Sequence, residues 1–321
     1  MANIPGDDFP TITLSLLRSL IVNRIDYHIV RLLSFLDVPS LEHLTMDMVH
    51  SYEANGTILW TSVHNFLQGN PPSLRHLTLR YMVLGCSFVD ILSTLSGLEY
   101  LKFDRCQMDD ELVASISGDD FPIISLSLLR SLIIRGIGCA IRQLLSVIDV
   151  SSLQRLTVDL GEDSRADDTL WASLAVPCLL RRDPLPLKEL TLQSITVLGG
   201  SFVSFVSRLS CLEYLTFDGC EVEDEILTAF ILDSHIPHDN RVCPRLIGLT
   251  FCHTIFPGDI LVKVLQSRTP LSGISREDRC LRSVEVFECP DIADHCVDLE
   301  NIMEACRGKF TFSCDCVFVN A

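Results

Sequence analysis

Positive charge is scarce in this sequence. Lysine and arginine total 25 against 42 aspartates and glutamates, which gives a formal net charge of −17 at pH 7. A chain with this excess of negative charge repels nucleic-acid phosphates and acidic membrane surfaces at long range. We therefore expect neither nucleic acid nor a membrane among its partners.

Long apolar runs are missing as well. Hydrophobic residues make up 48% of the chain, yet none of its stretches reaches the roughly 18 uninterrupted apolar residues of a membrane span. Residues 1–10 lack the basic and then apolar pattern of a secretory signal peptide. The sequence therefore predicts an intracellular protein, cytoplasmic or nuclear, with ample material for a buried core.

Recognisable catalytic and cofactor motifs are also absent. The phosphate loop G-x-x-x-x-G-K-S/T does not occur, and Gly199-Gly200, which precedes a helical pattern, has no lysine after it. Serine, histidine and aspartate are plentiful, but none of them lies in a recognisable nucleophile elbow. We expect no catalytic residues, no cofactor and no enzymatic activity.

Metal binding is the sharpest alternative, because potential ligands gather near the end of the chain: Cys280, Cys289, His295, Cys296, Cys306, Cys314 and Cys316. Structural zinc sites usually combine two ligand pairs with a defined gap between them. No such pair of pairs occurs here. Apolar and cysteine residues instead alternate with others over residues 310–318, which favours a terminal edge strand with cysteines on its buried face. We expect no metal site.

Repetition dominates the sequence. The pentapeptide GDDFP at residues 6–10 recurs at 118–122, and LSLLRSLI at residues 14–21 recurs unchanged at 126–133. Further along, the tetrapeptide LEYL at residues 98–101 returns at 212–215. This self-similarity predicts an internal duplication. The predicted parts are a first copy over 6–117, a second copy over 118–231, and shorter C-terminal repeats with a capping strand over 232–321.

A shorter unit, L-x-x-L-x-apolar, lies inside these copies. It begins at ten positions: Leu17, Leu41, Leu74, Leu98, Leu129, Leu153, Leu187, Leu212, Leu246 and Leu281. The end of each unit alternates apolar and other residues, which is the period of a half-buried strand. One strand cannot close a core alone, so neighbouring units must stack into a curved solenoid whose parallel strands line the concave face.

Apolar residues at helical spacing lie between the predicted strands. In the first copy these stripes are Ile29, Leu32, Leu33 and Leu36, and then Phe88, Ile91, Leu92 and Leu95 after Ser87 as the helix N-cap. In the second copy they are Ile141, Leu144, Leu145 and Ile148, and then Phe202, Phe205, Val206 and Leu209. The stripes predict helices on the convex side of the solenoid.

Together these patterns resemble the leucine-rich-repeat family, of the ribonuclease-inhibitor-like kind, over nearly the whole chain. Residues 1–321 are accordingly interpreted as a single α/β solenoid, or horseshoe, of about ten repeats. Cys106, Cys220 and Cys289 fall at the turn after a predicted strand, and this spacing is similar to the cysteine-containing repeats of fungal F-box proteins. We expect these cysteines to be small buried side chains at tight turns.

The outward side chains of the strands are the candidate binding surface. They occupy the second, fourth and sixth places after the first Leu of each unit. Threonine recurs at the fourth place, which its strand propensity explains, whereas exposed tyrosines beside mixed charges are typical interface anchors. The candidate partner-binding residues are His43, Asp47, His76, Arg80, Tyr100, Lys102, Asp104, Arg135, Arg155, Asp159, Glu189, Tyr214 and Asp218.

The resemblance implies a protein–protein interaction scaffold, since F-box proteins of this kind recruit substrates to an SCF-type, cullin-based ubiquitin ligase. An F-box is a helical segment that precedes the repeats, and the first repeat already begins at Leu17. The expectation is therefore a substrate-recognition scaffold that lacks or has lost its F-box, by truncation or as a paralogue. The alternative is a free-standing scaffold that inhibits an enzyme or regulates a small GTPase.

Overall fold

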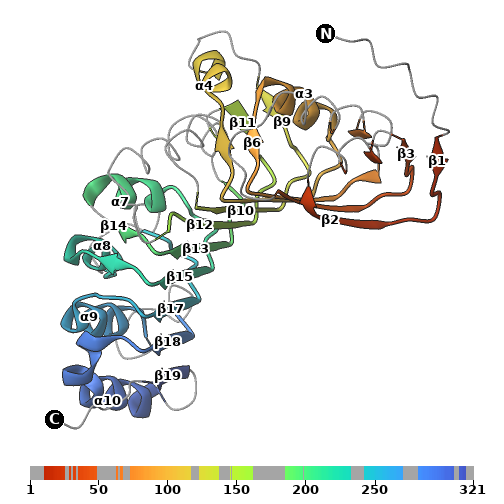
Figure 1. Ribbon diagram of the computed structural model, residues 1–321. Coiled ribbons are helices and arrows are strands. Elements are labelled where there is room, and N and C mark those ends of the chain that lie inside the picture. Colours follow the sequence, from red (N-terminus) through yellow and green to blue (C-terminus); the bar gives the residue numbers. More distant parts are fainter. Residues whose placement is uncertain are drawn as a thin grey trace.

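Each L-x-x-L-x-apolar unit forms one strand of a curved parallel sheet (Figure 1). The computed structural model describes residues 11–25, 35–48, 73–116, 123–136, 147–161, 185–197, 199–232, 242–269, 281–306 and 311–315, together with residues 29, 32, 33, 63, 66, 67 and 145. Within them the sheet has eleven strands in sequence order: β2 (Ser19–Ile25), β4 (His43–Met48), β5 (His76–Arg80), β7 (Tyr100–Asp104), β10 (Ser131–Arg135), β12 (Arg155–Asp159), β13 (Glu189–Gln193), β15 (Tyr214–Asp218), β17 (Gly248–Cys252), β18 (Ser283–Phe287) and β19 (Thr311–Asp315).

The predicted strands are confirmed. Each of the ten strands from β2 to β18 begins two residues after the first Leu of its unit. The eleventh strand, β19, pairs with β18 at the end of the sheet and matches the terminal edge strand expected within residues 310–318. The side chains of Cys314 and Cys316 lie outside the described part of the structure, so their burial stays a prediction.

Equivalent places of neighbouring units lie side by side. Leu77 of β5 pairs with Leu44 on one side and Leu101 on the other, and the same register continues to β19. The inward leucines are buried and the residues between them are half-buried or exposed, as in the pattern of β12. One in-register sheet therefore turns each place of the repeat into a row of side chains that crosses the concave face.

Helices and short strand pairs cover the outer side of the curve (Figure 1). The helices are α3 (Cys86–Thr94), α4 (Asp110–Ile116), α7 (Gly199–Ser207), α8 (Asp224–Ala229), α9 (Gly258–Arg268), η4 (Pro290–His295) and α10 (Cys296–Cys306). The short pairs are β1 (Ile12–Thr13) with β3 (Leu36–Asp37), β6 (Val83–Leu84) with β8 (Gln107–Met108), β9 (Ile124–Ser125) with β11 (Ile148–Asp149), and β14 (Thr196–Val197) with β16 (Glu221–Val222). No helix of the described residues is long and apolar enough to cross a membrane.

The four predicted helical stripes are confirmed only in part. The stripes of α3 and α7 are buried as expected, but α3 begins after Gly85, whose backbone takes the N-cap position, and not after Ser87. In the other two stripes, Leu36 and Ile148 lie in β3 and β11 because each pairs with a short strand of the preceding unit. Ile141 and Leu144 fall outside the described residues.

The same turn follows most strands of the sheet, and it explains why Cys106, Cys220 and Cys289 are buried after their strands. The residue after the strand has a positive φ, as at Arg105, whose backbone N–H donates to the Arg135 carbonyl of the next strand at 2.7 Å. The next side chain then caps the preceding strand. Cys106 and Cys220 donate to the carbonyls of Leu79 and Leu192 at 3.3 and 3.4 Å.

Cys289 makes the same contact with the Phe251 carbonyl at 3.6 Å. Thr254 occupies the equivalent place after β17, where its hydroxyl donates to the Phe217 carbonyl at 3.1 Å. All three turn cysteines are buried, so the prediction of small buried side chains at tight turns is confirmed. In every case the side chain donates a hydrogen bond to a carbonyl of the preceding strand of the sheet.

Candidate functional site

All thirteen candidate binding residues lie on the strands of the concave face, between β4 and β15. Their side chains alternate along the strands with the buried leucines, and their role in binding a partner stays a prediction. The register then decides which of them meet. Residues at the same place of consecutive units become lateral neighbours about 4.8 Å apart, and three rows of side chains result.

The first row is a charge row that sequence reasoning missed. It lies at the first place of each unit, just before the strands. Its ion pairs join Arg18 to Glu42 at 3.6 Å, Arg75 to Glu99 at 2.7 Å, and Lys188 to Glu213 at 3.1 Å. Like charges opposite each other in a sheet repel, and the paired units carry opposite signs. The basic and acidic residues that alternate after the first Leu of each of the first four units were the signal for this row, and the neutral Gln154 and Ile247 interrupt the alternation further along.

The sixth-place row at the other end of the strands follows the same rule. From β4 to β15 it runs Asp47, Arg80, Asp104, Arg135, Asp159, Gln193 and Asp218. Its closest contacts include Arg80 Nε to Asp104 Oδ2 at 3.8 Å and Gln193 Nε2 to Asp218 Oδ2 at 3.0 Å. Lys102 joins from the fourth place, with Nζ 3.1 Å from Asp104 Oδ2. This row therefore neutralises much of its own charge.

Three rings lie next to one another in the second-place row, on β4, β5 and β7. His43 and His76 stack with ring centroids 4.3 Å apart and planes 11° apart, and Tyr100 lies against His76 at 5.7 Å. Burial, followed by the proximity of His43, holds the pKa of His76 below its ordinary value. Burial also raises the pKa of the Tyr100 hydroxyl. His43, His76 and Tyr100 thus form a continuous series of ring contacts across three neighbouring strands.

Two adjoining hollows follow on the same face. The first has a volume of about 210 Å³ and is lined by Tyr100, Ser131, Ile133, Arg155, Leu156, Thr157, Glu189 and Thr191. The second has a volume of about 270 Å³ and is lined by Glu189, Leu190, Thr191, Tyr214 and Thr216. Ser131 opens the first hollow, because its small, buried side chain lies between Tyr100 and Arg155 in the row.

Tyr214 forms the far wall of the second hollow, and its position depends on a glycine. Gly248 is its in-register neighbour on β17. A Cβ atom at Gly248 would lie 2.7 Å from Cδ1 of Tyr214, so the ring leans over the bare glycine backbone. Tyr214 remains 44% exposed. Tyr100 and Tyr214 thereby bound a single stretch of surface that contains both hollows.

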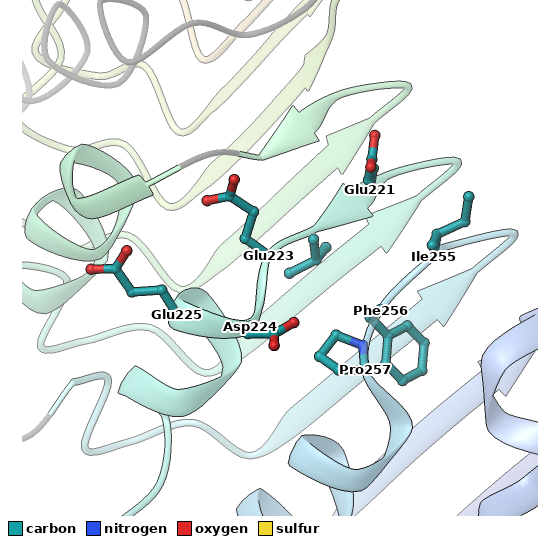
Figure 2. Close-up of a pocket in the computed structure, with 8 residues that line it drawn as sticks. Glu221, Glu223, Asp224, Glu225, Ile255, Phe256 and Pro257 are labelled. Carbon is teal, nitrogen blue, oxygen red and sulfur yellow. The ribbon is translucent and has the colours of Figure 1, made fainter.

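A third hollow, of about 570 Å³, lies beside β16 and the start of α8 (Figure 2). Figure 2 shows the carboxylates of Glu221, Glu223 and Glu225 pointing in different directions. Glu223 accepts a hydrogen bond from the backbone N–H of Gly199 at 2.9 Å, and Asp224 and Glu225 lie in the first turn of α8. Glu223, Asp224 and Glu225 therefore lie at helix N-termini, where a negative charge is favourable.

Metal ligands do not gather within the described residues. These residues contain no group of three or more His, Cys, Asp or Glu side chains placed to hold a metal ion. Of the cysteines near the end of the chain, Cys289 and Cys306 are buried. The side chains of Cys280, Cys296, Cys314 and Cys316 fall outside the described part.

One buried arginine was not anticipated. The Arg268 side chain, 1% exposed, donates to the carbonyls of Phe230, Cys243 and Val242 at 2.6, 3.1 and 2.7 Å. Its guanidinium carbon also lies 6.0 Å from the centroid of the Phe230 ring. The Arg268 side chain thus links the segments on both sides of residues 233–241. Its role is structural, and it does not belong to the concave surface.

The in-register parallel sheet, with one strand per unit and helices outside it, defines a leucine-rich-repeat solenoid. No protein-family model matches the chain, and no curated protein matches it in sequence. Among solved structures, it is similar to a chain of the Rad7–Elc1 complex of yeast, with a TM-score of 0.40 and 14% identity over 82% of this chain and 65% of that one. It thus spans less than two thirds of that chain's length.

It is also similar to an internalin of Listeria monocytogenes, with a TM-score of 0.33 and 13% identity over 95% of this chain and 88% of that one. The assignment of the fold rests on the sheet and its register.

Proposed function

We propose that this chain is a protein-binding scaffold that holds its partner against the concave face. The observation that carries the proposal is the stretch between Tyr100 and Tyr214, where two adjoining hollows share Glu189 and Thr191. Aromatic side chains beside arginines are typical anchors of protein interfaces. The hollows, at about 210 and 270 Å³, are smaller than the roughly 300–1,000 Å³ of small-molecule sites and fit side chains of a protein segment.

The experiment compares partners recovered on the full chain with those recovered on the double variant Tyr100→Ala/Tyr214→Ala. Loss of an interface anchor typically costs about 2 kcal/mol or more, which weakens binding by about 30-fold. We expect a stable partner to be recovered by the full chain and lost with the variant. Ile255→Ala is the matched control, because Ile255 is exposed beside the third hollow. Partners that the double variant retains in full would contradict the proposal.

A finer role follows from the resemblance of the cysteine-containing repeats to F-box proteins. We propose that the bound partner is a substrate delivered to a cullin-based ubiquitin ligase. Recovery of a cullin adaptor with the chain, independent of Tyr100 and Tyr214, would support this role. A stable concave-face partner recovered reproducibly without an adaptor would favour the alternative, a free-standing inhibitor of an enzyme or regulator of a small GTPase.

A further inference from the structure

Two charged side chains of the second-place row are left out of the ion pairs that cross the sheet. Arg155 and Glu189 are in-register neighbours on β12 and β13, and both are exposed. Neither forms an ion pair with any residue that the structure describes, nor with the other. Arg80, Lys102 and Arg135, by contrast, each have a carboxylate partner on the same face.

These two charges lie in the hollows that carry the proposed function. Arg155 lines the first hollow together with Tyr100 and Ser131. Glu189 lines both hollows and shares the second with Tyr214. The first hollow therefore combines Tyr100 with both charges, and the second combines Tyr214 with Glu189 alone. The two charges have opposite signs, and neither has an ion-pair partner among the described residues.

The distance between Tyr100 on β7 and Tyr214 on β15 sets the length of a ligand that reaches both hollows. From β7 to β15 the sheet crosses four strand spacings, which amount to about 19 Å at about 4.8 Å each. An extended chain covers that distance with about six residues, at roughly 3.3 Å per residue. A short extended segment laid across the strands can thus reach both hollows at once.

We propose that the concave face binds an extended segment of a partner protein that presents one acidic and one basic side chain close together. The acidic side chain faces Arg155, whose planar guanidinium can donate two parallel hydrogen bonds to a carboxylate. The basic side chain faces Glu189 and lies against the Tyr214 ring, where a cation is attracted to the ring face. This inference rests on the proposed function, since it names the chemistry of the same surface.

Charge complementarity favours a segment with both signs of charge over an all-acidic or an all-basic segment. An all-acidic segment would meet Glu189 as well as the negative field of a chain with a net charge of −17. An all-basic segment would gain from that field but would leave Arg155 facing a like charge. A segment with one charge of each sign, in the matching order, pairs both side chains.

The test is a selection of short random peptides, displayed on phage, against the folded full chain. We expect the enriched peptides to carry an acidic and a basic residue a few positions apart, in one preferred order. Arg155→Glu and Glu189→Arg should each weaken their binding by about tenfold or more, which corresponds to about 1.4 kcal/mol. The double variant Arg155→Glu/Glu189→Arg should select peptides with the reverse order of charges. Arg208→Glu and Glu300→Arg are matched controls, because both residues are exposed on outer helices or their ends.

The outcomes distinguish this inference from the function on which it rests. Peptides that need Tyr100 and Tyr214 but bind both charge-reversal variants as well as the wild type would overturn the inference and leave the proposed function standing. A selection that enriches no peptide dependent on Tyr100 and Tyr214 would overturn both. Reversal of the preferred charge order in the double variant would support both, because a merely structural role of Arg155 and Glu189 produces no such reversal.

Discussion

His43 and His76 stack on the concave face with ring centroids 4.3 Å apart and planes 11° apart. The pKa of His76 lies below its ordinary value because burial, and next the proximity of His43, disfavour its charged form. An unfolded chain therefore takes up a proton at His76 at higher pH than the folded chain does. The resulting contribution to stability is complete above about pH 6.5 and is lost as the pH falls below it.

His76→Gln removes this proton linkage. We expect the midpoint of urea unfolding to fall less for the variant than for the wild type when the pH is lowered from about 7.5 to about 5.5, the range in which histidine titrates. Unfolding curves at several pH values check this. Equal losses in both proteins would show that folding does not lower the pKa of His76.

The core of the sheet should not tolerate a charge. Leu215 is 1% exposed and lies between Leu190 and Leu249 in the sheet, so we expect Leu215→Asp to lose about 4 kcal/mol or more of stability. Thr216→Asp is the matched control, because it places the same carboxylate one residue away on the concave face. Thermal melts followed by circular dichroism measure both variants. A control as destabilised as Leu215→Asp would contradict the assigned faces.

Three buried cysteines should react slowly. Burial raises the pKa of the Cys106 and Cys220 thiols to about 11 and that of Cys243 to about 12. Because the thiolate is the reactive form, we expect alkylation of these three at mildly alkaline pH to be slower than that of Cys86 and Cys211, which are only half-buried. The difference should exceed about tenfold. Mass spectrometry of peptides from a time course measures each rate, and rates that are equal in the folded chain would contradict the burial.

The repeat made the strands predictable because leucine spacing depends only on local periodicity. The two stripes that ended wrongly show where this fails. Leu36 and Ile148 fit a helical face equally well, and only pairing with Ile12 and Ile124 of the preceding unit places them in short strands. At these two positions the secondary structure depends on a pairing partner about 24 residues earlier in the chain, which a local sequence pattern cannot show.

The candidate site was predictable to the same extent. Alternation identified which side chains face outward, but not which of them meet. Arg155 and Glu189 form no ion pair with the part of the chain that the structure describes, and this depends on side-chain positions in an in-register sheet, which the sequence does not specify. Arg268 was missed because its three carbonyl acceptors lie 25 to 38 residues away in sequence.

Arg268 should matter for stability. Arg268→Met keeps an apolar stem but leaves the carbonyls of Phe230, Val242 and Cys243 without their donor. Hydrogen bonds to a charged group contribute about 1.5–3 kcal/mol each, so we expect a loss of at least about 3 kcal/mol in urea unfolding. Arg282→Met, at an exposed position, is the control and should change stability little. A loss of the same size in both variants would argue against the buried network.

Gly248 should control binding through Tyr214. In Gly248→Ala the added Cβ would lie 2.7 Å from Cδ1 of Tyr214 and 3.1 Å from Oγ of Ser283, so the ring must move off its neighbour. The backbone of Gly248 has no positive φ, and alanine suits a strand interior better than glycine. We therefore expect a stability change within about 1 kcal/mol but binding of the selected peptides weakened by about tenfold, as for a displaced interface anchor.

Gly200→Ala separates this local effect from a general one. Gly200 lies in α7, where a Cβ atom meets only Glu225 Oε1 at 3.9 Å. The change should alter stability by less than about 1 kcal/mol, since Gly200 lies in the first turn of α7 and not in the helix interior. It should leave peptide affinity unchanged, because α7 lies on the outer side of the curve (Figure 1). If Gly248→Ala binds the peptides as tightly as Gly200→Ala does, Tyr214 is not an anchor of the second hollow.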